Sequence, residues 1–191
     1  MRTLNEELHE RRKQEIMEKC FDCYAEYGIN NVGIKGLGKA CGMASGVIYN
    51  YFENLDDLII QATAHCMSKV EDDFMEKAPL TPDEVYRFID EIPYWTAEHH
   101  GKKYRLMYQV YTNPKYIEYG KKFFEGVNER YTQYAEQLEP NIGIPKNVIV
   151  SFIFMLIRAS VHYALFEDEY YLQAQLSTLK KAFELVAKKR L

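Results

Sequence analysis

Residues 34–52, IKGLGKACGMASGVIYNYF, contain two short helical patterns separated by a glycine. The first pattern places apolar residues on one face of a helix, at Ile34, Leu37 and Cys41. Gly42 ends this pattern, because glycine enters left-handed backbone without a steric penalty. A second helix is predicted from Ser45, with Ile48 and Phe52 on its apolar face. Two short helices joined by a glycine-containing turn predict a helix-turn-helix, whose second helix can enter the major groove of DNA.

The face of this second helix opposite Ile48 is small or polar and can form hydrogen bonds. It carries Ser45, Gly46, Tyr49 and Asn50. Lys35 and Lys39 lie one turn apart on the preceding helix, where they would add positive charge. The same periodicity also fits an ordinary pair of packed helices, so DNA binding does not follow from the pattern alone.

The run GMASGVIYNYF, residues 42–52, resembles the turn and recognition helix of the tetracycline-repressor (TetR) family without a gap. The positions that carry the likeness are Gly42, Gly46, Ile48, Tyr49, Tyr51 and Phe52, followed by Leu58. Upstream, residues 16–28 (IMEKCFDCYAEYG) resemble the family's first helix, which ends at the same kind of glycine. The resemblance covers roughly residues 1–60 and implies a transcriptional regulator, in the usual case a repressor released from its DNA operator by a small molecule.

The resemblance also implies roles for the residues on the recognition helix and the helix before it. Ser45, Gly46 and Asn50 would lie nearest the bases. Contacts to DNA phosphates would come from Tyr49, Lys35 and Lys39.

Departures from the family's pattern predict a modest DNA affinity, or a half-site preference unlike the family's common ones. Family members often carry a Thr at the start of the second helix, a Ser or Thr before the third helix, and a Lys after it. This chain has Gly33, Ala44 and Leu55 at these places, so two helix caps and a phosphate contact are missing. The net charge is −4, and residues 1–60 hold more acidic than basic side chains. This balance fits a DNA-binding protein with few phosphate contacts. It equally fits the alternative of a helical interaction protein of the same fold that has lost DNA binding.

The composition is that of a helical protein in a reducing compartment. The chain has 191 residues, of which 47% are hydrophobic, enough for one large or two small helical domains. No secretory signal pattern opens it, and the cysteines fall within helical patterns, so we expect a cytoplasmic protein. Residues 148–166 are nearly long enough to cross a membrane, but Arg158 and His162 interrupt them. A buried helix and no membrane partner are therefore expected.

The predicted fold is all-α, with about nine helices. A three-helix helix-turn-helix DNA-binding domain is predicted for residues 1–54, and a helical ligand-binding and dimerisation domain for residues 55–191. Asn54 or Asp56 can cap the fourth helix, which is expected to end near Lys77. Pro93 is expected to break or kink the next helix, and Gly101 to end that segment. A loop is predicted for residues 140–145.

The last two helices predict a homodimer. Residues 148–157 (VIVSFIFMLI) are apolar around the whole helix and need cover on more than one side. The final helix repeats apolar residues at spacings of four and three, at Leu172, Leu176, Leu179, Phe183 and Val186. Two such helices from each of two chains would form a symmetric four-helix interface, as the resemblance also implies.

An effector cavity is predicted inside the C-terminal helices. Its candidate lining residues are mainly aromatic: Trp95, Tyr104, Tyr108, Phe124, Phe152 and Met155. Arg158 and His162, on one helix face, would supply polar anchors, because a buried Arg needs a protein carboxylate or a ligand carboxylate. Each of these residues could instead be ordinary core. The cavity hypothesis predicts a mainly apolar or aromatic effector of drug-like size, whose binding shifts the helix at residues 55–77.

No enzyme activity, cofactor or metal site is predicted. The GxSxG, HExxH, Walker and GxGxxG patterns do not occur in the sequence. Cys20 and Cys23 have the spacing of a redox or metal pair, but on a helix this spacing places two small apolar residues on the buried face. No second pair completes a tetrahedral metal site. His99 and His100 diverge by about 100° on a helix and would not bind one metal together.

Overall fold

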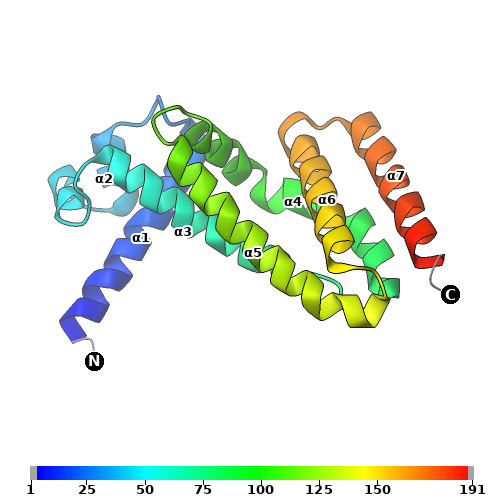
Figure 1. Ribbon diagram of the computed structural model, residues 1–191. Helices are drawn as coiled ribbons and strands as arrows, with labels where there is room; N and C mark the ends of the chain where they lie inside the picture. The colour runs from blue at the N-terminus through cyan, green and yellow to red at the C-terminus, as the bar shows by residue number, and fades with distance from the viewer. Residues whose placement is uncertain (1–3, 189–191) are drawn as a thin grey trace. The chain divides into compact units, whose positions relative to one another are not determined.

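The computed structural model describes residues 4–188, and the regular structure in this range is entirely helical (Figure 1). In chain order the elements are α1 (Leu4–Tyr27), α2 (Ile34–Cys41), the 3-10 helix η1 (Ser45–Asn50), α3 (Leu55–Glu76), α4 (Pro82–Tyr111), α5 (Ile117–Ile142), α6 (Lys146–Phe166) and α7 (Glu169–Lys188). The all-α prediction is confirmed. The described range contains seven α-helices and one 3-10 helix, close to the nine expected.

α4 is one helix of 30 residues that contains both Pro93 and Gly101. The predicted end at Gly101 and a break at Pro93 are therefore wrong, whereas a kink at Pro93 stays a prediction. Pro93 is buried, and a buried stripe continues through Ile92, Thr96 and His100 on either side of it. Packing along this stripe offsets the cost of about 3 kcal/mol that a proline imposes inside a helix. Gly101 has a packing role, since a Cβ at this position would lie 3.3 Å from the carbonyl oxygen of Ala164 on α6.

Two smaller differences concern the recognition helix and the predicted loop. Residues 45–50 form a 3-10 helix rather than an α-helix, and its N-cap residue Ala44 makes no side-chain capping bond. Pro140 lies inside α5, which extends to Ile142, so the loop before α6 is shorter than predicted.

The chain groups into two compact units. The first contains the residues up to Asp72 together with Arg105–Phe123, and the second contains Asp73–Tyr104 and the residues from Phe124 onward. The predicted boundary between residues 54 and 55 is a division by function and stays a prediction.

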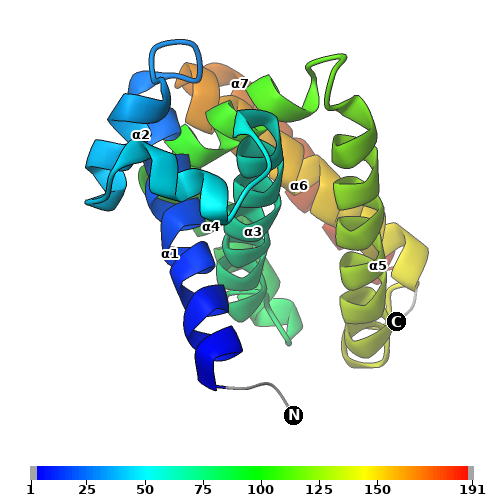
Figure 2. The ribbon, with the colours of Figure 1, turned by 90° about the vertical axis from the view of Figure 1, so that its left-hand side faces the viewer.

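In the first unit, α2 packs against both α1 and η1 (Figure 2). The core here consists of side chains that are almost fully buried, among them Ile16, Phe21, Leu37, Ile48 and Phe52. Asn54 caps α3 as predicted, with its Oδ1 accepting a hydrogen bond of 2.9 Å from the backbone N–H of Asp57. Asp56 accepts hydrogen bonds from Lys115 and Tyr116, which lower the pKa of this carboxyl group and attach α3 to the segment before α5.

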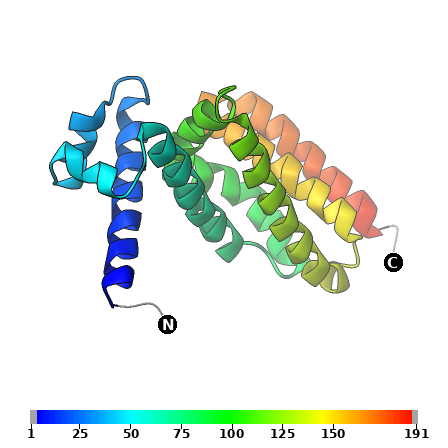
Figure 3. The same ribbon diagram turned by 60° about the vertical axis from the view of Figure 1, so that its left-hand side comes forward.

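In the second unit, α6 and α7 run antiparallel to each other, joined through Glu167 in left-handed backbone (φ 55°) (Figure 3). The seam Leu172, Leu176, Leu179 and Phe183 is buried within this chain, at 5% exposure or less. Among the described helices, α6 alone has the length and mean hydropathy (1.9) of a membrane span, yet only 28% of that segment is buried. An apolar helix surface is therefore left uncovered in the single chain.

Candidate nucleic-acid interface and apolar cavity

The turn between α2 and η1 is held by backbone geometry around Gly42. This residue is the C-cap of α2 and adopts φ 66° and ψ 36°, in the left-handed region that glycine tolerates. The next N–H, that of Met43, donates to the carbonyl of Gly38 over 2.9 Å. The N–H of Gly42 itself donates to the carbonyl of Lys39 over 3.1 Å. These two bonds satisfy carbonyls in the last turn of α2 and direct the chain into η1.

Gly38 has a steric role that its low helix propensity does not predict. A Cβ at this position would lie 3.0 Å from the carbonyl oxygen of Met43 and 3.0 Å from the backbone nitrogen of Ser45. The start of η1 therefore packs directly on the backbone of α2. From the sequence, Gly38 predicts only a softer helix, whereas in the structure its missing side chain allows the close approach of the two elements.

The candidate DNA-contacting residues all reach the surface of this unit. Lys35, Lys39, Gly46, Tyr49 and Asn50 are exposed, and Ser45 is partly exposed. In contrast, Ile48 and Phe52 are 0% and 2% exposed and anchor η1 to the core. Within the described residues, neither Lys35 nor Lys39 forms an ion pair, so both charges are available to a ligand.

Sequence reasoning missed one exposed residue of this surface, Val47, which is 37% exposed between Gly46 and Ile48. Its exposure could have been predicted, because Val47 does not lie on the face of the helix that carries Ile48 and Phe52. The basic cluster near residue 12 is partly neutralised, because Arg12 forms a 2.8 Å ion pair with Glu15. That contact lowers the pKa of the Glu15 carboxyl group.

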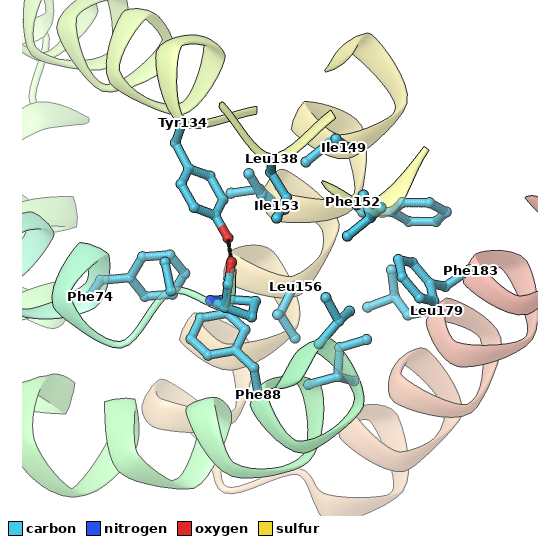
Figure 4. Close-up of a pocket in the computed structure, with 15 residues that line it drawn as sticks. Phe74, Phe88, Tyr134, Leu138, Ile149, Phe152, Ile153, Leu156, Leu179 and Phe183 are labelled. Carbon is cyan, nitrogen blue, oxygen red and sulfur yellow. Dashed lines mark hydrogen bonds between the residues drawn. The ribbon is translucent and has the colours of Figure 1, made fainter. Parts of the chain in front are cut away.

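The second unit contains an apolar cavity of about 60 Å³ (Figure 4). Side chains from the end of α3, from α4 and α5, and from α6 and α7 surround it: Phe74, Val85, Phe88, Ile89, Tyr134, Leu138, Ile142, Ile149, Phe152, Ile153, Leu156, Leu179 and Phe183, with Ala78 and Pro79 between α3 and α4. Tyr134 brings a side-chain hydroxyl to this lining, and it donates a hydrogen bond to the carbonyl of Pro79. Burial raises the pKa of the Tyr134 hydroxyl.

Comparison with known proteins settles the family. A family model described as bacterial regulatory proteins of the tetR family matches residues 16–62. The HTH-type transcriptional repressor AcnR of Corynebacterium glutamicum is 22% identical over 148 residues, which cover 74% of this chain and 75% of AcnR. This chain belongs to the TetR family. It is a helix-turn-helix, DNA-binding transcriptional regulator.

Solved TetR-type structures share the fold over nearly the whole chain. A TetR transcription regulator from Haloarcula marismortui superposes with a TM-score of 0.70 at 15% identity, covering 93% of this chain and 98% of that one. FadR from Bacillus subtilis, solved in complex with stearoyl-CoA, superposes with a TM-score of 0.56 at 18% identity, covering 91% and 96%.

In this TetR-family chain, the predicted effector-binding residues do not surround one cavity. Phe152 lines the apolar cavity. Trp95 lines a separate open groove of about 410 Å³, where Lys77 Nζ lies 4.6 Å from its ring centroid. Tyr104 is buried in the core, whereas Tyr108 belongs to the first unit and is half-buried. A role for these residues in effector binding stays a prediction.

The other four predicted residues lie at or near the surface. Phe124 and Met155 are each 43% exposed, and Arg158 is exposed as well. His162 is half-buried, with Nε2 3.7 Å from Asp168 Oδ2. The expectation of a buried Arg158 is wrong for the single chain, because Arg158 shares an exposed stripe of α6 with Met155. Sequence reasoning missed most of the residues that line the cavity. Two of them, Leu179 and Phe183, were assigned to the dimer seam instead.

Much of the exposed apolar surface of the second unit lies on α6 and α7, although Leu80, Tyr94 and Phe124 are exposed elsewhere in the unit. The large members on α6 and α7 are Phe154, Met155, Phe166, Tyr170 and Leu185, which are 41–88% exposed. Between Tyr170 and Leu185, the exposed positions of α7 include the small residues Ala174, Ser177 and Thr178. Small side chains of this kind allow another helix to approach closely. We call the exposed faces of these two helices the α6–α7 surface.

Proposed function

We propose that this TetR-family regulator is a homodimeric repressor, and that a small apolar or aromatic effector releases it from its DNA operator. The observation that carries the proposal is the exposed polar face of η1 beside Lys35 and Lys39, which form no ion pair within residues 4–188. The similarity to AcnR, which is described as a repressor, supports this direction of control. A protein that binds the chromosome in this way works in the cytoplasm.

The proposed contacts follow from exposure and chemistry. Ser45, Gly46 and Asn50 lie nearest the base edges, and Val47 contacts a thymine methyl group, which apolar side chains recognise in the major groove. Tyr49, Lys35 and Lys39 contact phosphates, which position the protein without reading the sequence.

Dimer formation is supported by the α6–α7 surface. Its apolar side chains are too many and too exposed for a helix that faces only water. A second copy of the same surface would bury them in a symmetric four-helix contact. Two recognition helices would then reach successive major grooves, whose spacing is about 34–36 Å.

The apolar cavity is the proposed effector site, and it has to widen to work. Its volume of about 60 Å³ is small beside the roughly 300–1,000 Å³ of a typical ligand pocket. The fold neighbour FadR was solved with stearoyl-CoA, which shows that a protein of this fold accommodates a bulky apolar chain. Phe74 and Pro79 of the cavity flank the C-terminal end of α3. Widening therefore displaces α3, the helix that continues along the chain from the helix-turn-helix.

The test is binding of the purified protein to the DNA upstream of its own gene, measured by fluorescence anisotropy at several salt concentrations. We expect specific binding that weakens with salt, and release when an apolar effector from a hydrophobic compound library is added. Asn50→Ala should lose discrimination between operator and random DNA, whereas Gln133→Ala, on the exposed surface of α5, should not. Salt-insensitive or absent binding to every upstream fragment would instead support the interaction-protein alternative.

A further inference from the structure

Two buried cysteines meet between α1 and α2. Cys20 Sγ of α1 lies 3.5 Å from Cys41 Sγ, which belongs to the last residue of α2. The two residues are 0% and 2% exposed, and both thiols are free. Sequence spacing had singled out Cys20 with Cys23, but the structure pairs Cys20 with a residue on another helix.

The environment makes the two thiols chemically unequal. The hydrogen bond with the Cys20 thiol, together with the positive charges of Lys19 and Arg12, lowers the pKa of Cys41. The same contact and burial raise the pKa of Cys20. A thiolate is the nucleophilic form of cysteine, so Cys41 is the one prepared to attack.

We propose that Cys20 and Cys41 form an oxidation site, at which hydrogen peroxide closes a disulfide that disables the DNA-binding face. The consequence for DNA rests on the proposed function, whereas the disulfide itself does not. The small size of the oxidant matters, because the pair is buried. Ala40, the neighbour of Cys41, and Cys23 line an open groove of about 750 Å³ in the same unit, which brings solvent close to the pair.

The chemistry takes two steps. The Cys41 thiolate attacks one peroxide oxygen, forming an S–O bond as the O–O bond breaks, and hydroxide leaves and takes up a proton to become water. Cys20 then attacks the sulfur of the resulting sulfenic acid, forming the S–S bond as the S–O bond breaks. The proton of Cys20 leaves with the hydroxyl group as a second water molecule. The two sulfurs together lose two electrons, which reduce the peroxide.

Closure has a direct mechanical effect on the recognition element. A disulfide requires a sulfur separation of about 2.05 Å, so the two sulfurs must approach by about 1.5 Å from their present 3.5 Å. Cys41 immediately precedes the Gly42 turn, and a Cβ added at Gly38 would lie only 3.0 Å from the backbone of Ser45, so the start of η1 packs closely on α2. α2 and η1 are in close contact here. A shift of the end of α2 toward α1 is therefore passed to η1.

Cys23 provides a matched control within the same helix. It lies one turn from Cys20 but is half-buried. Burial raises its pKa, so it lacks the activation that Cys41 has. Cys23→Ala should leave both the oxidation and its consequence unchanged.

The experiment uses the reduced full-length protein, titrated with hydrogen peroxide and quenched with an alkylating reagent. Peptide mass spectrometry is expected to find a Cys20–Cys41 link that dithiothreitol removes. DNA binding to the upstream fragment is expected to be lost on oxidation and restored on reduction. Cys20→Ala and Cys41→Ala should each bind DNA in the presence of peroxide, and two independent variants protect the test against one that fails to fold.

The outcomes separate this inference from the proposed function. Absence of the Cys20–Cys41 link after oxidation overturns the oxidation site, whatever the DNA result. Formation of the link without loss of binding overturns its regulatory role. Failure of the reduced protein to bind any upstream DNA overturns the proposed function and the regulatory role, while the peptide map still decides whether the disulfide forms.

Discussion

In the helix-turn-helix, Leu37 and Ile48 are 0% exposed and the accessible face is mostly polar, whereas α6 and α7 leave Phe166 and Tyr170 69% and 88% exposed. The first region completes its core within one chain and presents hydrogen-bonding groups. The second also has a buried seam, yet it retains apolar surface. The difference indicates that the two regions are built for different partners, a charged polar one and a second apolar surface.

The largest expected effect is on the α6–α7 surface. Met155→Asp places a charge in the proposed dimer contact, which should cost about 3–5 kcal/mol and weaken dimerisation by a hundredfold or more. The subunit should stay folded, because Met155 is 43% exposed in the single chain. Sedimentation velocity over a range of concentrations measures the shift to monomer.

Two further variants control this measurement. Gln133→Glu, on the exposed surface of α5, should leave the dimer intact. Leu179→Asp should instead unfold the protein, because Leu179 is 2% exposed and lines the cavity. A wild-type protein that is a stable monomer at micromolar concentration would contradict the proposed use of this surface.

The next effect concerns the polar partner of the helix-turn-helix. Replacing Lys35 and Lys39 by alanine in both subunits removes up to four bonds to phosphates, so the slope of log K against log salt should become less steep by about 0.9 for each phosphate no longer neutralised. Tyr49→Phe should weaken binding to all sequences alike, because a phosphate contact carries no sequence information. Anisotropy titrations at several salt concentrations measure both effects. An unchanged slope in the double lysine variant would exclude these two residues from the interface with DNA.

Local signals predicted most of the helix-turn-helix from the sequence. Three such signals are Gly42, the apolar spacing of residues 34–52 and the Asn54 cap. Each acts within a few residues of the chain, so it can be recognised from the sequence. The role of Gly38 could not be seen, because it depends on the backbone of Ser45 approaching α2.

The second unit was harder to predict because its decisive contacts are distant in sequence. Gly101 looks like a helix end until Ala164 is found packed against it. The cavity joins Phe74 to Phe183, from opposite ends of the unit, and periodicity does not reveal whether such residues leave a space between them. Arg158 looked buried because its neighbours are apolar, although the stripe it occupies is exposed.

A buried imidazole makes the stability of the second unit depend on pH. His100 is 5% exposed, and neither ring nitrogen has a hydrogen-bond partner among the described residues, although Asp73 Oδ2 lies 3.4 Å from Nε2. Burial, with Lys103 adding to it, lowers the pKa of His100 to about 4 despite the Asp73 carboxylate. When the pH is below about 6.5, the usual pKa of histidine, this side chain binds a proton in the unfolded state but stays neutral in the folded state. Stability is therefore lost as the pH falls from about 6.5 toward 4.

This loss should amount to roughly 2 kcal/mol at pH 5, since each pKa unit is worth about 1.4 kcal/mol. Urea unfolding at pH 7 and pH 5 gives the loss in free energy of unfolding for wild type and for His100→Phe. The two proteins share every other titrating group, so the difference between their losses is the contribution of His100. His99→Gln, which replaces the exposed neighbour, should keep the wild-type dependence. If His100→Phe and wild type lose the same stability between the two pH values, His100 is not the responsible group.

The smallest effect tests the missing cap at the start of η1. Ala44 is the N-cap residue with φ −62° and ψ 135°, the extended backbone in which a serine cap normally sits, but it makes no side-chain bond. Ala44→Ser should let the new hydroxyl accept a backbone N–H of the first turn, stabilising the protein by about 1 kcal/mol and raising Tm by about 2–4 °C. Ala40→Ser makes the same chemical change inside α2, where serine only lowers helix propensity, so it should give no gain. If the cap also holds η1 ready for DNA, affinity should rise by up to about fivefold. A higher Tm with unchanged affinity would show that η1 is already ordered by Ile48 and Phe52, so that the apolar core alone sets the DNA-binding face.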